Sequence, residues 1–229
     1  MSDLTIIVLT KNNLFELLET LNSIEKFCEG VTICIVDGSK NIFDIKKYSS
    51  IKNYSNQYKY FYKPKIKGIY PSMNFAIEKV KTKYLMFLNS GDLLLKSPQE
   101  EISIISKHNL ICVFSSAKIF YKDEYLYSAP PLSVKNFSLW FLFGQLPIHQ
   151  SMIISSKWSK KNLYPTNCEI TSDNTIKREI ISTKKYMYSN NELVSFSLGG
   201  LSSSFSIKTL KIYLQSNNLS LTRKILITI

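Results

Sequence analysis

Arginine is nearly absent from this sequence. Of its 29 basic residues only Arg178 and Arg223 are arginine, so the net charge of +12 comes almost entirely from lysine. Proteins that read a DNA sequence depend on the two parallel hydrogen bonds that arginine forms with a base edge. The shortage of arginine therefore argues against sequence-specific DNA recognition. The lysine excess still predicts attraction to anions, either phosphorylated ligands or an acidic lipid surface.

Three other patterns are missing. The cysteines lack the C-x-x-C spacing of zinc sites and are too sparse for a secreted disulfide scaffold. We therefore expect reduced core thiols at Cys28, Cys34, Cys112 and Cys168. The segment TKNNLFE after the first apolar run lacks the glycines of a dinucleotide-binding loop, which argues against a dinucleotide-dependent oxidoreductase. That apolar run has no basic leader and is too short for a signal peptide or a membrane span, so we expect a cytoplasmic protein.

A chain of 229 residues that is 45% hydrophobic can bury a sizeable core in one domain, or in one domain with a modest appendage. Compact apolar or aromatic runs predict strands at residues 4–10, 31–37, 57–64 and 84–90. Apolar residues at three- and four-residue intervals predict helices at about 13–27 and from Pro71 to about residue 80. This alternation, with right-handed crossovers, predicts a parallel sheet and an α/β fold.

Beyond the fourth strand the patterns are less regular. We expect a helix with Ser97 as its N-cap, a strand at 111–121 followed by a hairpin, and a helix at 171–181. Residues 40–56 are typical of a weak helix or an irregular linker. The tail from 201 to 229 is basic and amphipathic, and it contains no acidic residue.

Polar residues follow three of the predicted strands: Thr10 to Asn12, Asp37 to Ser39, and Asn89 to Asp92. The carboxyl ends of parallel strands meet at the same edge of a sheet, and open α/β sheets bind their ligands there. These three loops are therefore expected to form one binding site.

Seven segments, in order, resemble the inverting family-2 glycosyltransferases of the GT-A fold, in particular small bacterial enzymes that build capsule, exopolysaccharide and O-antigen repeats. They read TIIVLTKNN, CIVDGSK, GIYPSMNFAI, YLMFLNSGD, PIHQSMII, TSDNTIKRE and FSLGGLSSS. The resemblance implies a GT-A Rossmann-like nucleotide-binding sheet, a mixed acceptor-side region and a basic amphipathic C-terminal tail. Its expected divisions are a nucleotide-sugar-binding subdomain at 1–105, an acceptor-binding subdomain at 106–200 and the tail at 201–229.

Asp37 is the first candidate for contact with the nucleotide. A carboxylate at the end of a buried strand can accept a hydrogen bond from the base N–H or from a ribose hydroxyl, as the family's equivalent position does. The alternative is a turn or helix-cap aspartate, for which Asp-Gly is also suited. Thr10 and Asn12 are further donor-binding candidates, although loop Thr and Asn side chains more often bond to the local backbone.

The segment GIYPSMN resembles a family stretch that usually reads Gly-Ile-Tyr-Asp-Ala-Met-Asn. Gly68, Tyr70 and Asn74 are therefore candidates to line the donor sugar. Pro71 replaces the acid of that stretch, so no carboxylate role carries over to this position.

The loop NSGD implies a metal site. A divalent cation that bridges the donor phosphates offsets the charge of the leaving nucleoside diphosphate, and such a hard cation prefers oxygen ligands. Asp92 would hold Mn²⁺ or Mg²⁺, Ser90 and Gly91 would let the backbone approach the donor, and Asn89 would bond to the donor sugar. The family usually has two acids here, as Asp-x-Asp, whereas this loop has one, which predicts loose binding. The alternative for Asp92 is an ordinary turn acid.

An inverting transfer needs a base that accepts the proton of the attacking acceptor hydroxyl. Asp173 in ITSDNTIKRE matches the family's position best, and Glu169 is the second choice. A helix cap without chemistry is the alternative for Asp173. His149 and Gln150 in PIHQ are candidates to contact the diphosphate or the acceptor, although a lone histidine beside a proline is often structural.

The resemblance implies transfer of a hexose or N-acetylhexosamine from a nucleotide diphosphate sugar, with UDP expected, to a polyprenyl-diphosphate-linked or oligosaccharide acceptor. Aromatic residues at 136–146 and the basic tail would suit adsorption to the anionic inner face of the plasma membrane. The alternative is that the aromatic residues belong to an ordinary core and that the lysines form a solvated face. The competing function is a noncatalytic module that binds anions or nucleic acid through its charge. A preference for UDP over duplex DNA would separate the two.

Overall fold

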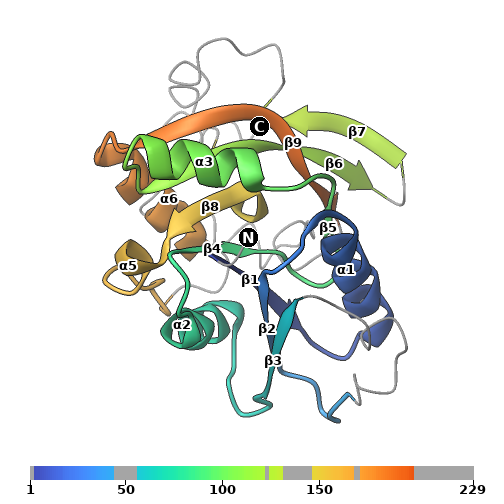
Figure 1. Ribbon diagram of the computed structural model, residues 1–229. Coiled ribbons are helices and arrows are strands. Elements are labelled where there is room, and N and C mark those ends of the chain that lie inside the picture. The colour runs from blue at the N-terminus through green and yellow to red at the C-terminus, as the bar shows by residue number, and fades with distance from the viewer. Residues whose placement is uncertain (1–2, 44–55, 122–123, 131–145, 168–170, 199–229) are drawn as a thin grey trace, which may run out of the picture.

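The computed structural model describes residues 3–43, 56–121, 124–130, 146–167 and 171–198. Its strands are β1 (Leu4–Thr10), β2 (Thr32–Asp37), β3 (Gln57–Tyr62), β4 (Tyr84–Phe87), β5 (Leu93–Leu94), β6 (Cys112–Tyr121), β7 (Glu124–Ala129), β8 (Met152–Ser155) and β9 (Tyr186–Leu198). Its helices are α1 (Leu14–Phe27), α2 (Ile69–Lys79), α3 (Gln99–Lys107), α5 (Ser156–Ser159) and α6 (Ser172–Ser182), with a 3₁₀ turn, η3 (His149–Ser151). Within these residues the strands form one sheet, in the order β3-β2-β1-β4-β8-β6-β9-β5, with β7 paired to β6 (Figure 1).

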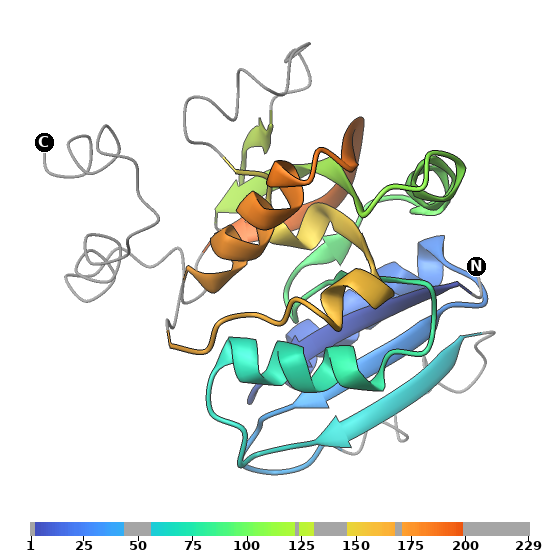
Figure 2. The same cartoon turned by 90° about the vertical axis from the view of Figure 1, so that its left-hand side faces the viewer.

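The first half of the sheet is parallel. Strand β1 lies between β2 and β4, and β3 continues the sheet beyond β2, all in the same direction. Residues of β1 alternate between two cores, because successive side chains of a strand point to opposite faces. Leu4, Ile6 and Val8 pack in the core that contains α1, whereas Ile7 packs in the core that contains α2. The helices therefore cover opposite faces of the sheet, and Figure 2 shows α2 along one of them.

Helix α1 follows β1 after a short turn. The Asn13 side chain caps its first turn by accepting a hydrogen bond from the N–H of Glu16 at 3.2 Å. Leu17, Leu21 and Ile24 recur on one face and are buried against the sheet. The polar face of α1 points toward solvent and toward the loop after β4.

The second half of the sheet is mixed. Strand β8 pairs antiparallel with both β4 and β6, and β9 pairs parallel with β6. The chain passes from β4 through the Asn89–Asp92 loop to β5, which pairs with β9 at the far end of the strand order. The sheet curls so that β5 comes to lie beside α1 (Figure 1). The loop is thus enclosed by β1, α1 and β9.

The α/β fold class, the first four strands with their parallel pairing, and the helices after β1 and before β4 are confirmed. The structure places the N-cap of α3 at Pro98, one residue after the predicted Ser97. Buried free thiols are confirmed at Cys28, Cys34 and Cys112.

Several predictions lie outside the described residues. They concern Cys168, most of the 40–56 segment, the aromatic residues up to 145, and the 201–229 tail. The described residues include no helix that is both long enough and apolar enough to cross a membrane. The division of the chain near residue 105 stays a prediction.

Candidate active site

The carboxyl ends of β2, β1 and β4 are joined by backbone hydrogen bonds. Thr10 and Asp37 are partners in the β1–β2 register, and the N–H of Gly38 donates to the carbonyl of Thr10 at 3.0 Å. On the other side of β1, the N–H of Ser90 donates to the carbonyl of Leu9 at 3.0 Å. The three polar loops expected to meet at one edge therefore do lie side by side.

Asp37 is fully buried at this edge. One of its carboxylate oxygens accepts the N–H of Ser39 at 2.8 Å, and the other accepts the hydroxyl of Tyr60. Burial, followed by the bond to Asp37, raises the pKa of Tyr60 and keeps its hydroxyl protonated. The Ser39 hydroxyl in turn accepts the N–H of Asn12 at 2.6 Å, and the Asn12 side-chain oxygen accepts the N–H of Lys40 at 3.0 Å. The β1 and β2 loops thus hold each other in one conformation.

Helix α1 holds the Asn89–Asp92 loop through one buried side chain, Thr20. Its hydroxyl donates to the carbonyl of Asp92 at 2.9 Å and accepts the N–H of Gly91 at 3.0 Å. The side-chain oxygens Asn89 Oδ1 and Ser90 Oγ of this loop are buried, and neither has a hydrogen-bond partner among the described residues. Buried polar atoms without partners are unfavourable, so these two oxygens mark a place where a polar ligand or a cation would be accommodated.

Asp92 is only 5% exposed. Its carboxylate is bonded by the N–H of Ser197 in β9 and by the Gln150 side chain, and burial raises its pKa to about 8, with the nearby charge of Glu16 adding to the rise. The Asp92 carboxylate and the unpartnered oxygens of Asn89 and Ser90 are hard donors, which suit Mg²⁺ or Mn²⁺. Within the described ranges, no group of three or more His, Cys, Asp or Glu side chains could hold a metal. The donor set fits a hard cation, then, but only if neutral oxygens complete it.

A second polar cluster surrounds Asp173 in the first turn of α6. One carboxylate oxygen pairs with the ammonium of Lys177 at 2.8 Å, and the other accepts the hydroxyl of Tyr70 at 3.1 Å. Lys177 also donates to the carbonyl of Pro147 at 3.2 Å. Burial alone would raise the pKa of Asp173, but the Lys177 charge, the nearby His149 and the hydrogen bonds from Lys177 and Tyr70 together outweigh burial and hold the pKa below its usual value. Asp173 is therefore ionised at neutral pH, with its side chain 21% exposed.

The sequence and the fold together now identify the family. The family model described as "Glycosyl transferase family 2" matches residues 5–167. This chain belongs to glycosyl transferase family 2. No individual curated protein matches it in sequence.

Solved structures with the same fold include two of TarS from S. aureus. TarS 1–349 in complex with UDP-GlcNAc has a TM-score of 0.70 at 15% identity, covering 98% of this chain and 70% of that one. A longer TarS structure has a TM-score of 0.65 at 14% identity. The match covers 99% of this chain and 42% of that TarS chain. The mannosyltransferase PcManGT from Pyrobaculum calidifontis, in complex with GDP-Man and Mn²⁺, has a TM-score of 0.59 at 10% identity, covering 88% and 58%. These likenesses show the GT-A fold.

In this family-2 glycosyltransferase His149 lies near Asp173 and is 7% exposed. Its Nε2 shares a 2.6 Å hydrogen bond with the hydroxyl of Tyr164, and its ring packs against Phe87 with centroids 5.2 Å apart. Burial lowers the pKa of His149 to about 4, against the opposing effect of the Asp173 charge. The imidazole is therefore neutral at physiological pH.

The α2 residues of the glycosyltransferase bind their neighbours in the protein. Asn74 exchanges two 2.9 Å hydrogen bonds with the backbone of Tyr164, and the Tyr70 ring stacks on that of Tyr164 with centroids 5.7 Å apart. Gly68 precedes α2 with a φ of +103°, a conformation that favours glycine. Tyr70 is thus brought to Asp173, whereas both polar atoms of Asn74 already have partners.

Sequence reasoning missed two residues of this cluster, Lys177 and Tyr164. Lys177 stands four residues after Asp173 on a predicted helix, a spacing that places the two on one helical face and could have revealed the pair. Tyr164 carries no comparable signal, because its contacts come from α2 and η3, which are distant in sequence. Glu169 lies outside the described residues.

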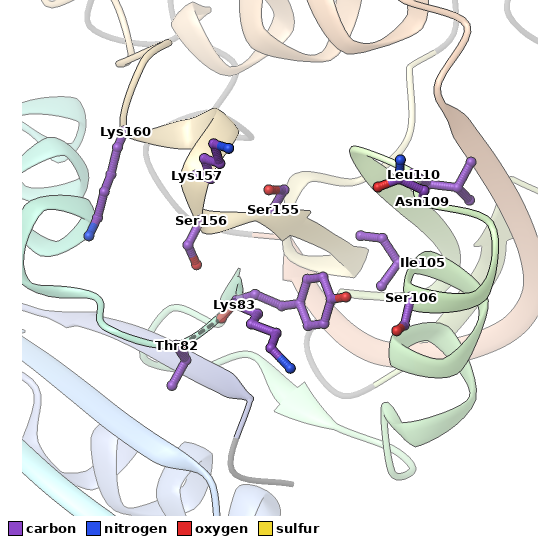
Figure 3. Close-up of a pocket in the computed structure, with 11 residues that line it drawn as sticks. Thr82, Lys83, Ile105, Ser106, Asn109, Leu110, Ser155, Ser156, Lys157 and Lys160 are labelled. Carbon is purple, nitrogen blue, oxygen red and sulfur yellow. Dashed lines mark hydrogen bonds between the residues drawn. The ribbon is translucent and has the colours of Figure 1, made fainter.

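A cavity of about 470 Å³ lies at the opposite edge of the sheet, where β4 begins and β8 ends (Figure 3). Lys83, Ser156 and Lys157 are among the residues that line it. None of the candidate donor-binding or catalytic residues contributes to this cavity.

Proposed function

We propose that this glycosyltransferase transfers a hexose or N-acetylhexosamine, with inversion, from a UDP-sugar to a lipid-linked or oligosaccharide acceptor in surface polysaccharide synthesis. The observation that carries the proposal is the meeting of the Thr10–Asn12, Asp37–Ser39 and Asn89–Asp92 loops at one sheet edge. TarS has been solved with UDP-GlcNAc and PcManGT with GDP-Man, which supports a nucleotide-sugar donor for this fold.

Asp37 is the residue proposed to contact the uracil or the ribose. Each carboxylate oxygen has a second lone pair beyond those bonded by Ser39 and Tyr60, so it can accept one further hydrogen bond. The bonds from Ser39 and Tyr60 fix the carboxylate, which reduces the conformational entropy lost when a ligand binds. Thr10 and Asn12 flank the same position and are proposed to line the nucleotide.

The Asn89–Asp92 loop is proposed to receive the sugar and the diphosphate. Asn89 and Ser90 supply side-chain oxygens that have no hydrogen-bond partner among the described residues. When bound, Mn²⁺ or Mg²⁺ supplies positive charge that offsets the charge developing on the leaving nucleoside diphosphate. Asp92 is the ligand predicted from the sequence, and PcManGT was solved with Mn²⁺.

Asp173 is proposed to accept the proton of the acceptor hydroxyl. At the same time the oxygen of that hydroxyl forms a bond to the anomeric carbon, and the bond between this carbon and the diphosphate breaks. A general base must be ionised before it acts, and the Lys177 pair ensures this at neutral pH. Tyr70 and Lys177 each bond one oxygen and so orient the carboxylate. Glu169 is the alternative base, and neutral His149 is proposed to lie beside the reacting groups.

Thermal-shift measurements with UDP, GDP, dTDP and duplex DNA, each with and without Mn²⁺, test this proposal. UDP should raise the melting temperature most, the increase should grow with Mn²⁺, and it should disappear in Asp37→Asn. Asp3→Asn, which removes an exposed acid far from this edge, is the matched control. Equal shifts with every anion, DNA included, would instead indicate a charge-driven binding module.

The acceptor and the membrane are further parts of the proposal. A polyprenyl-diphosphate-linked acceptor would require a cytoplasmic protein that associates with the inner face of the plasma membrane, through the basic tail and the aromatic residues at 136–146. Sedimentation with vesicles containing about 30% anionic lipid should carry down the full chain and leave a chain ending at residue 200 in solution. Equal sedimentation of both chains would contradict a role for the tail.

A further inference from the structure

Glu16 lies against the loop that carries the candidate metal site. A side-chain carbon built on Gly91 would be 3.3 Å from Glu16 Oε2 and 3.4 Å from Glu16 Cδ. The Glu16 carboxylate therefore occupies the space into which a side chain at position 91 would extend. Gly91 has a φ of +94°, which most residues with a side chain do not adopt. The loop has no acid of its own at this position, yet a carboxylate from α1 lies there.

The two acids near the loop differ in their bonding. The Asp92 carboxylate is buried and bonded by Ser197 and Gln150. The Glu16 carboxylate is half-buried, and no described residue forms a hydrogen bond or an ion pair with it. Of the two, Glu16 has both the exposure and the unused oxygen lone pairs that a metal ligand requires.

The position of Glu16 relative to the loop is fixed from two sides. Its own N–H is bonded by the Asn13 cap, which anchors the first turn of α1. Thr20, one helical turn later on the same face, bonds the N–H of Gly91 and the carbonyl of Asp92. The unpartnered oxygens of Asn89 and Ser90 belong to the same loop and provide neutral oxygen donors.

We propose that Glu16 supplies a carboxylate oxygen to the divalent cation at the Asn89–Asp92 loop, in place of the acidic side chain that this loop lacks at Gly91. The inference rests on the proposed donor site and adds a ligand to it. It also explains how a loop with a single acid binds a cation, because the second carboxylate comes from the helix beside the loop.

A titration of the purified full chain with Mn²⁺, with UDP present, tests the inference without measuring turnover. Electron paramagnetic resonance measures the free Mn²⁺ at each step. Glu16→Gln should weaken Mn²⁺ binding by about tenfold. Glu19→Gln, an exposed acid on the same helix, is the matched control and should leave binding within about twofold of the wild type. Equal Mn²⁺ affinity in Glu16→Gln and the wild type would overturn the inference.

Glu16→Asp separates direct ligation from a general effect of charge. This substitution keeps the negative charge but withdraws the carboxylate oxygens by one methylene. If Glu16 is a direct ligand, Mn²⁺ binding should become weaker, whereas a charge effect alone should leave the Mn²⁺ affinity unchanged. Wild-type affinity in Glu16→Asp would therefore also overturn the inference. UDP binding in EDTA, measured by thermal shift, should be the same in all variants. A wild-type chain that does not bind UDP at all would refute the proposed function, a result distinct from either outcome for Glu16.

Discussion

Replacing Asp92 with asparagine should stabilise the metal-free protein, and the gain should grow as the pH rises. Burial raises the pKa of Asp92 from 3.8 to about 8. Between these two values the unfolded chain has lost the proton of this carboxyl, whereas the folded chain keeps it. The folded state therefore binds more protons, so the stability that this group contributes is fully present below pH 3.8 and is lost as the pH rises through 8.

The expected magnitude follows from the two pKa values. Integrating the proton-binding difference from pH 6 to pH 8 gives a decrease of about 2 kcal/mol in the free energy of unfolding from Asp92 alone. Asparagine does not titrate and so removes this decrease. Other groups that titrate in the same range, such as His149 in the unfolded chain, are common to both proteins and cancel in the comparison.

Urea unfolding of the wild type and Asp92→Asn at pH 6, 7 and 8, in EDTA, measures the effect. EDTA is needed because a bound cation would favour the ionised carboxylate. The difference in unfolding free energy between the two proteins should change by about 2 kcal/mol over this range. Asp3→Asn, which changes an exposed acid, should show a constant difference. Parallel pH profiles for the wild type and Asp92→Asn would refute the reasoning, since they would mean that the buried carboxyl does not titrate near pH 8.

Three further substitutions test the polar contacts around the site. Lys177→Met leaves the Asp173 carboxylate without its ion pair, and urea unfolding should show a decrease of about 3 kcal/mol in the free energy of unfolding. A decrease no larger than that caused by a typical surface substitution would contradict the pairing. Asn74→Ala removes both hydrogen bonds to the backbone of Tyr164, and urea unfolding should show a loss of about 2 kcal/mol in the free energy of unfolding. Thr20→Val keeps the shape of the side chain but removes its hydroxyl, so amide hydrogen exchange at Gly91 should become faster by mass spectrometry; unchanged exchange would show that Thr20 does not hold the loop.

Strands β1, β2 and β4 of the parallel half could be predicted because they are buried on both faces. Such strands are nearly continuous apolar runs, as in residues 4–10, and their spacing leaves room for one helix between each pair. The mixed half gave a weaker signal, from which β6 and its hairpin with β7 were predicted but β5, β8 and β9 were not. Strand β9 contains Asn190 and Asn191 within an alternating pattern, and β5 has only two residues. Their pairing depends on contacts between distant parts of the chain, which local sequence patterns do not report.

The candidate site was predictable to the same degree. Asp37 and the Asn89–Asp92 loop could be placed at one edge, because strand ends follow directly from strand positions. The surroundings of Asp92 could not be inferred, since its partners Gln150 and Ser197 come from segments far along the chain. The nearness of Glu16 to Gly91 was equally hidden, because it arises from the packing of α1 against a loop.

The continuous sheet limits how this glycosyltransferase can admit its substrates. Strand β8 pairs with β4 at Tyr84 and Leu85, so main-chain bonds cross from the parallel half of the sheet to the mixed half. A hinge motion that swung these halves apart would have to break those bonds. Entry and release must therefore depend on rearrangement of the segments beyond the strand tips, while the platform beneath them stays rigid. Acceptor preference could then diverge between relatives by exchange of those segments alone.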